Sequence, residues 1–469
     1  MPKELPGFYY DEEKNRYFPY KGPIPGSSRK PPPIRPSSDP KQQADDLCQT
    51  FKIRPGLLHA REFCGNVIYS FKKKLSFQAE YQKRHASQPT IWKYKRTKKM
   101  ANISLEHVVA DVILPHGLEE RDILLSCGAH GLVCVFQTAN FRQEINSADM
   151  YEADRVRPLN LDQTPRQTEL LRELGSSFGS TSYLTSDISC LAMLGKSSLT
   201  TDGTMSKRFL ITTLGSDIAT GSVYLLDLSE PLDFSSPILV GSVLHGIAGF
   251  KQTLWTADSD PRGTHAAIGT SKGVVLLNIE TGASTWAFDC KSDVFSLQLN
   301  QSGNSMLCGL RNGKIVTVDT RQRQMKKSAR SSSVISMPSS VCCLTSLEHW
   351  DQYFLASSMD GSMKLYDRRL THRGAVQSYE GNVNSHTRIQ LGVDPAEKVV
   401  MSGGEDCNMR MWNIKSGELL LRDRFMDSIP SAVCWSTSRE KEKTRSYWEE
   451  HGMGAWVGSY EGIFYMDWL

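Results

Sequence analysis

The feature that most constrains the fold of this 469-residue chain is a hairpin pattern that recurs seven times. Each copy has an apolar strand, a turn of Gly or polar residues, and a second apolar strand that ends at Asp, Asn or Gln. Glycine and Asp-Gly tolerate the positive φ that a tight hairpin turn requires. The seven copies occupy residues 125–137, 212–227, 267–278, 307–319, 355–367, 400–413 and 455–467.

The spacing of the hairpins indicates how they assemble. Five of the six intervals between their final residues lie between 41 and 54 residues, near the roughly 40–45 residue period of one propeller blade. Each hairpin also follows another strand-like segment, such as 293–304 or 387–398. The repeats resemble WD40 repeats, although only Trp412 keeps the tryptophan of that signature. We therefore expect an all-β fold, a seven-bladed WD40-type β-propeller.

Charge divides the chain into two parts. Residues 1–100 contain 21 basic and 9 acidic side chains, whereas the remainder contains 34 basic and 42 acidic ones. We expect a partly extended basic N-terminal arm over 1–104, with a Pro/Ser-rich linker at 23–41, followed by the propeller over 105–469. Two inserts are expected, one at about 140–183 and one at 438–452. A short helix is expected in the middle of the first insert. Such inserts on a rigid scaffold are common places for specificity.

The ring must also close, because an open edge strand invites aggregation. The sequence given ends just after the last hairpin, so we expect the last blade to take its outermost strand from upstream of the first blade. The segment TIWKYKR (90–96) is the favoured closing strand, and NVIYSFK (66–72) is the alternative.

Several other functional classes lack support in the sequence. No apolar run approaches the roughly 18 residues of a membrane helix, and the first ten residues do not follow the plan of a signal peptide. The eleven cysteines are scattered without a CxxC pair, and the histidines show no HExxH spacing, so we expect reduced thiols, no metal and no cofactor. The fragments LGKSS (194–198) and GSSFG (175–179) lack the context of a phosphate loop or a nucleophile elbow. We expect no catalytic residues.

Two copies of an Asp-x-Arg motif supply the candidate binding residues. Asp319 with Arg321 and Asp367 with Arg369 end the same strand of two consecutive repeats. An Asp there can accept backbone N–H groups of the turn, and an Arg two residues later presents a planar five-donor fork to a partner. In an isolated copy of the motif, the arginine usually lies in solvent at the rim of the propeller. Two copies at one position of adjacent blades predict a binding patch.

Paired motifs of this kind resemble the box of WD-repeat substrate receptors of cullin-4 RING ubiquitin ligases, with Val318 and Tyr366 where that family prefers Trp. The segment LPGFYYDEEKNRYFPYKG (5–22) is similar to one group of these receptors. The resemblance implies a non-catalytic subunit that docks on the adaptor damaged-DNA-binding protein 1 through Arg321 and Arg369. Cullin-4 and a RING subunit would join through the adaptor. A short helix before the propeller would enter the adaptor, with 41–51 as first candidate and 75–85 as second.

Two other functions remain open from the sequence. The protein could be a ligase-independent scaffold that shares only the fold. It could also bind nucleic acid through Lys93–Lys99, although the net acidic body makes direct nucleic-acid binding the weakest hypothesis. The same basic run could be a nuclear import signal or a solvated strand end, and we expect a location in nucleus and cytoplasm. The protein substrate is not specified by the sequence.

Overall fold

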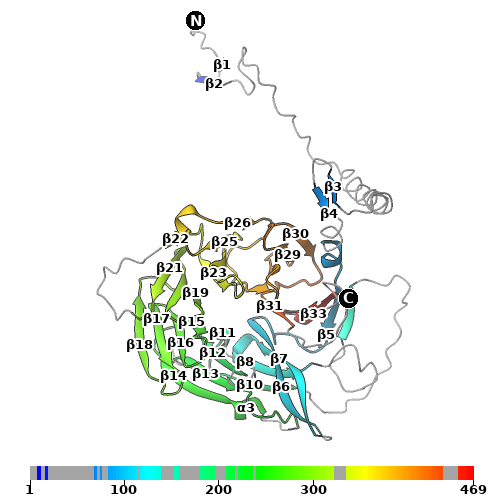
Figure 1. Cartoon of the computed structure of the whole chain (residues 1–469), viewed down its shortest axis with the longest axis vertical. Helices are drawn as coiled ribbons and strands as arrows, with labels where there is room; N and C mark the ends of the chain where they lie inside the picture. The colour runs from blue at the N-terminus through cyan, green and yellow to red at the C-terminus, as the bar shows by residue number, and fades with distance from the viewer. Residues whose placement is uncertain are drawn as a thin grey trace, which may run out of the picture. The chain divides into compact units, whose positions relative to one another are not determined.

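Seven antiparallel sheets, six with four strands and one with five, are arranged as blades around a central axis and form the body of the computed structural model (Figure 1). The structure describes the backbone of residues 8–11, 16–19, 68–70 and 74–76. It describes residues 83–114, 117–138, 153–157, 179–195, 207–216, 220–235, 239–321, 334–436 and 453–468 more fully. The predicted seven-bladed all-β propeller is confirmed.

The first three blades follow the sequence in order. Blade 1 contains β6 (Ser104–Leu114), β7 (Gly117–Cys127), β8 (Leu132–Gln137) and β10 (Gly179–Tyr183). Blade 2 contains β11 (Ile188–Met193), β12 (Arg208–Thr213), β13 (Gly221–Asp227) and β14 (Leu244–Phe250), with α3 (Leu239–Val243) before its last strand. Blade 3 contains β15 (Leu254–Ser259), β16 (His265–Thr270), β17 (Gly273–Asn278) and β18 (Ser284–Asp289).

The next three blades repeat this order. Blade 4 contains β19 (Val294–Leu299), β20 (Ser305–Leu310), β21 (Lys314–Asp319) and β22 (Val334–Ser336). Blade 5 contains β23 (Val341–Ser346), β24 (Tyr353–Ser358), β25 (Met363–Asp367) and β26 (Gln377–Tyr379). Blade 6 contains β27 (Leu391–Val393), β28 (Val399–Gly403), β29 (Met409–Asn413) and β30 (Leu419–Asp423). Single 3-10 turns lie at Ala129–Gly131 and Thr371–Arg373.

Blade 7 closes the ring with strands from three parts of the chain. Its own strands are β31 (Ala432–Trp435), β32 (Met453–Ser459) and β33 (Gly462–Trp468), and β5 (Thr90–Tyr94) pairs with β33 in antiparallel register, Phe464 opposite Lys93. The closing strand is therefore the segment favoured from the sequence. The alternative segment supplies β3 (Ile68–Ser70), which pairs instead with β4 (Lys74–Ser76).

The insert after β8 contributes to two blades. Its residues Ala153–Arg157 form β9, which adds to β5 as a fifth strand of blade 7. Its last residues form β10 and complete blade 1, so the predicted insert boundary at 183 overlaps propeller structure. The helix expected in its middle and the insert expected at 438–452 lie outside the described residues.

The chain divides into two compact units, 1–80 and 81–469. The expected boundary at 104 falls inside the second unit, because β5 and the helical turn at 83–86 belong with the propeller. Within the first unit, β1 (Phe8–Asp11) and β2 (Arg16–Pro19) form a hairpin. Of the two helix candidates, 41–51 lies outside the described residues. The second, 75–85, begins with two residues of β4, and only residues from 83 onward are described as helical.

The core consists of seven clusters of buried side chains, each shared by two neighbouring blades in the described part of the chain. Closure continues this pattern, since Ile91 is fully buried with blade 6 and blade 7 residues. Several cysteines pack as small hydrophobes: Cys127, Cys134 and Cys308 belong to these clusters. The described cysteines are free thiols.

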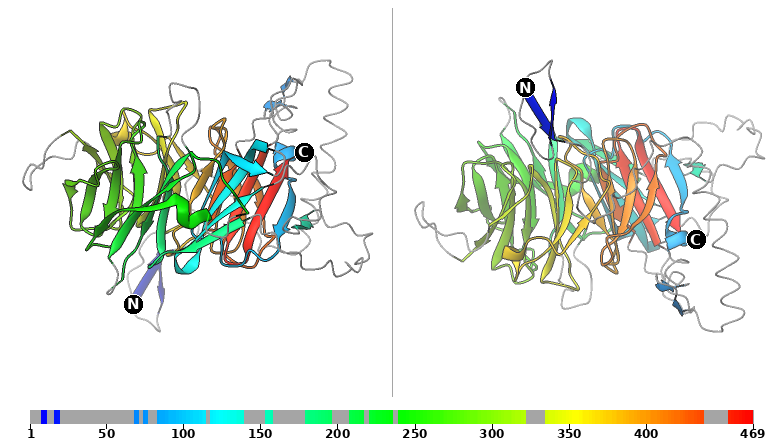
Figure 2. Two further views of the ribbon diagram at one scale, coloured as in Figure 1. Left: turned by 90° about the horizontal axis from the view of Figure 1, so that it is seen from below. Right: turned by 90° about the horizontal axis from the view of Figure 1, so that it is seen from above.

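Antiparallel pairing fixes two faces of the ring, seen edge-on in Figure 2. In each of blades 1–6 the first and third strands finish at the same end of the sheet, because neighbouring strands are antiparallel. We call the face formed by these strand ends and the described turns that follow them the motif face. The second–third turns and the connections between blades form the opposite face, where Gly313 and Gly361 adopt φ of +80° and +83° as tight turns require.

Candidate functional site

On the motif face, the same turn-capping hydrogen bond recurs at the end of the third strand. In blades 2–6 an Asp or Asn there accepts a hydrogen bond from the backbone N–H two residues later. This bonding arises because short carboxylate and amide side chains readily bridge their own turn. The residues concerned are Asp227, Asn278, Asp319, Asp367 and Asn413. The sequence reasoning on the turn is confirmed at these positions.

In two consecutive blades an arginine side chain also bonds the capping aspartate. In blade 4, Arg321 Nε and Nη2 donate to the two oxygens of Asp319 at 3.1 and 2.9 Å. In blade 5, Arg369 Nε and Nη2 donate to the two oxygens of Asp367 at 3.0 and 2.8 Å. We call each of these bidentate Arg–Asp pairs a fork. The two forks have the same geometry, and both arginine side chains remain about two-thirds exposed, at 69% and 63%.

Bidentate pairing leaves a defined set of donors for a partner. A guanidinium has five N–H donors, and each fork uses two of them on its own aspartate. The remaining N–H groups, two on Nη1 and one on Nη2, are not committed to that aspartate. Each arginine side chain is already held in one conformation by its aspartate. It would therefore lose less conformational entropy on binding a carbonyl or carboxylate than an unrestrained arginine would.

The aspartates stay ionised over the physiological range. The side-chain hydrogen bond from Arg321, with the backbone N–H bond, lowers the pKa of Asp319 to about 2. The corresponding hydrogen bond from Arg369 lowers the pKa of Asp367. Asp367 is the more enclosed carboxylate, with its side chain 5% exposed against 30% for Asp319. The four predicted site residues thus form two similar ion pairs on adjacent blades.

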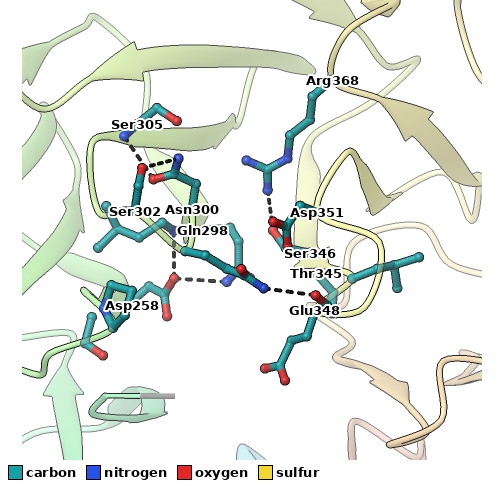
Figure 3. Close-up of a pocket in the computed structure, with 15 residues that line it drawn as sticks. Asp258, Gln298, Asn300, Ser302, Ser305, Thr345, Ser346, Glu348, Asp351 and Arg368 are labelled. Carbon is teal, nitrogen blue, oxygen red and sulfur yellow. Dashed lines mark hydrogen bonds between the residues drawn. The ribbon is translucent and has the colours of Figure 1, made fainter. Parts of the chain in front are cut away.

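A cavity of about 650 Å³, lined mostly by polar residues, lies on the same face (Figure 3). Its walls are first–second turns of blades 3, 4 and 5, and they include Asp258, Glu348 and Asp351. Asp258 is held within the wall, since its Oδ2 accepts from Leu299 N at 2.7 Å and Gln298 Nε2 at 3.1 Å. The cavity was not predicted, because it is assembled from three turns far apart in the sequence.

Arg368, between Asp367 and Arg369, is the basic side chain of this cavity. It turns inward, where Nη2 donates to Ser346 Oγ and the guanidinium lies 5.7 Å from the centroid of the Phe354 ring. Burial lowers its pKa, and its buried Nε has no hydrogen-bond partner. The two successive arginines therefore face different surroundings, one the cavity and the other the exterior.

The basic run Lys93–Lys99 is folded onto blade 7. Lys93 Nζ lies 2.9 Å from Glu461 Oε2, and Lys95 Nζ lies 3.1 Å from Asp154 Oδ1. Lys98 and Lys99 lie 5.9 and 5.5 Å from the centroid of the Tyr460 ring. The run thus consists of the end of the closing strand β5 and the turn that follows it, an arrangement that favours the structural interpretation of these cations.

Among the residues that the structure describes, no group of three or more His, Cys, Asp or Glu side chains could hold a metal ion. No helix in the described part of the chain is long and apolar enough to cross a membrane.

Comparison with known proteins addresses the stretch that carries both forks. Residues 244–442 match the family described as the DDB1- and CUL4-associated factor 4 beta-propeller domain. The propeller resembles this family. The match runs from the fourth strand of blade 2 to the start of blade 7 and includes Asp319, Arg321, Asp367 and Arg369.

Individual relatives agree with this match over a limited length. The chain is 32% identical to human DDB1- and CUL4-associated factor 4 over 152 residues, which cover 32% of the chain and 30% of that protein. It is 34% identical to human DDB1- and CUL4-associated factor 4-like protein 2 over 152 residues, 32% of the chain and 37% of that protein. WD repeat-containing protein 21 of Schizosaccharomyces pombe is 24% identical over 185 residues, 36% of the chain and 42% of that protein. Each alignment spans well under half of the relative.

Proposed function

We propose that this protein is the non-catalytic substrate-recognition subunit of a cullin-4 RING ubiquitin ligase. The motif face docks on the adaptor damaged-DNA-binding protein 1, through which cullin-4 and a RING subunit join. The observation that carries the proposal is the pair of matching forks, Arg321 on Asp319 and Arg369 on Asp367, at one position of adjacent blades. The family match over the same blades supports it.

The mechanism is positional. Docking of the motif face leaves the opposite face available to hold a protein substrate. Lysines of that substrate then reside at high effective concentration near the ubiquitin carrier recruited by the RING subunit. No step requires a catalytic group or a cofactor on this chain.

The test is binding of the purified full chain to the purified adaptor. We expect the Arg321→Ala/Arg369→Ala double variant to raise the dissociation constant at least about 30-fold, as expected for two desolvated interface anchors. The matched control is Arg311→Ala/Arg424→Ala. These arginines are similarly exposed, at 66% and 56%, and are paired with Asp293 and Asp427 on the opposite face.

The outcomes separate the hypotheses. Loss of binding in the first double variant and full binding in the control support the ligase subunit. Absence of adaptor binding by the well-folded native chain would favour the ligase-independent scaffold. Steeply salt-dependent binding of nucleic acid through Lys93–Lys99 would favour the nucleic-acid hypothesis.

A further inference from the structure

Blade 6 has a lysine at the position where blades 4 and 5 have the fork arginines. Asn413 ends its third strand, and its Oδ1 accepts from the backbone N–H groups of Lys415 and Ser416 at 3.0 and 2.9 Å. The residue two positions after the cap is therefore an exposed lysine where blades 4 and 5 have arginines. Three consecutive blades thus present a cation at the same position of the motif face.

Lys415 contacts an exposed tryptophan of the neighbouring blade. Its Nζ lies 5.2 Å from the centroid of the Trp350 ring, within the range of a cation–π interaction. Trp350 lies in the first–second turn of blade 5 and is 44% exposed. The contact joins blades 5 and 6 across the motif face and helps to orient the indole.

The turn that carries Trp350 also forms one wall of the cavity on the motif face. Leu347, Glu348 and Asp351, on either side of Trp350 in sequence, line that cavity. Glu348 and Asp351 are exposed, and with Asp258 they give the lining three carboxylates against the one guanidinium of Arg368. A protein surface that covers Trp350 would therefore also cover the mouth of an acidic cavity.

We infer that the docking surface extends beyond the two forks to Trp350, Lys415 and this cavity. The inference rests on the proposed function and names the same occupant, the adaptor. Its surface would offer carboxylates or carbonyls to Arg321, Arg369 and Lys415. Trp350 supplies the large aromatic side chain that most often dominates interface affinity. The net acidic cavity suits a lysine or arginine side chain of the adaptor.

The inference predicts the effect of removing one exposed indole. Trp350→Ala in the full chain should raise the dissociation constant for the purified adaptor about 30-fold. The matched control is Trp286→Ala, which removes an indole of similar exposure, 38%, from the outer strand β18 of blade 3. We expect the control to bind like the native chain. Thermal unfolding of both variants checks that they are folded, so that weaker binding by Trp350→Ala does not come from misfolding.

A charge reversal tests the cavity separately. Glu348→Lys should weaken adaptor binding about tenfold, because it places a cation where a partner cation would enter. Asp187→Lys, an equal change of charge at an exposed site on the opposite face, should leave binding unchanged. An equal effect of the two reversals would mean that net charge alone acts, and would overturn the cavity as a docking feature.

The design distinguishes failure of this inference from failure of the proposed function. If the Arg321→Ala/Arg369→Ala variant loses adaptor binding but Trp350→Ala retains it, the extended docking surface is overturned and the ligase assignment stays intact. No binding by the native chain would overturn both. Losses with Trp350→Ala and Glu348→Lys, and none with their controls, establish the wider surface.

Discussion

Arg388 Nη1 donates a hydrogen bond to the carbonyl oxygen of Ser189, 3.0 Å away and 199 residues earlier in the chain. The same nitrogen contacts the carbonyl oxygen of Trp255. One side chain from the connection before blade 6 therefore joins blades 2 and 3. Ser189 and Trp255 are the residues skipped by the register shifts at the start of β11 and β15, where a bulge leaves backbone groups outside the ladder.

Removal of Arg388 should therefore destabilise the ring. We expect Arg388→Ala to lower the free energy of unfolding by about 2 kcal/mol, since hydrogen bonds to charged groups contribute roughly that amount. Urea unfolding of the full chain measures the change. Arg373→Ala, at an exposed turn, is the control and should have no effect, and a similar loss in both would contradict the bridging role.

Two N-terminal truncations that differ by 19 residues should differ in stability, because only the longer one removes the closing strand β5. Removal of residues 1–80 leaves the second compact unit whole, so the shortened chain should remain folded and monodisperse. Removal of residues 1–99 also deletes Ile91, which is fully buried, and exposes the edge of β33. That chain should aggregate and unfold at lower temperature. Size-exclusion chromatography and thermal unfolding compare the two, and equal behaviour would show that β5 is dispensable for closure.

Glu405 makes stability depend on pH. Burial alone would raise its pKa, but hydrogen bonds from Ser385, Thr387 and backbone N–H groups outweigh that effect and lower the pKa to about 2. A carboxyl with a depressed native pKa stabilises the fold fully above its ordinary value of 4.5, and this contribution is lost as the pH falls toward 2.

We expect Glu405→Gln to lower the free energy of unfolding by about 1 kcal/mol at pH 7, and by clearly less at pH 3. Urea unfolding at the two pH values measures the difference. Glu280→Gln, at an exposed turn, should change stability at neither pH. A penalty for Glu405→Gln that is constant between pH 7 and pH 3 would argue against the hydrogen-bonded carboxylate as its source.

The two fork aspartates should differ in their contribution to stability. Asp367 is 5% exposed and Asp319 is 30% exposed, although both accept three hydrogen bonds from their arginine. Asp367→Ala should therefore lower the free energy of unfolding by about 1 kcal/mol, and Asp319→Ala by less because water already screens that pair. Denaturant midpoints of the two variants give the comparison, and the reverse order would mean that burial does not control the effect.

Local chemistry made much of this architecture predictable. Glycines such as Gly313 and caps such as Asp319 and Asp367 act within their own turn, so the hairpins, their register position and the two forks can be derived from short stretches of sequence. The closing strand follows from the need to cover an edge. Lys415 had a sequence signal too, since Asn413 ends the equivalent strand.

The remaining features depend on residues that the sequence does not place together. Trp350 meets Lys415 across two blades, Arg388 meets Ser189 across the ring, and β9 joins blade 7 from an insert in blade 1. No local pattern distinguishes these residues from ordinary turn or loop residues. The inward direction of Arg368 likewise depends on Phe354 and Ser346, which the strand pairing of blade 5 brings beside it.

Closure by β5 has a consequence for the order of folding. The hydrogen bond from Ile463 N–H to Thr97 Oγ1 joins residues 366 apart, and contacts so distant in sequence form slowly because a long loop must close first. During synthesis β5 emerges long before β33, so its edge stays unpaired while six blades are made. The nascent chain is therefore most exposed to aggregation before blade 7 is complete, and blade 7 is complete only when its two distant segments have joined.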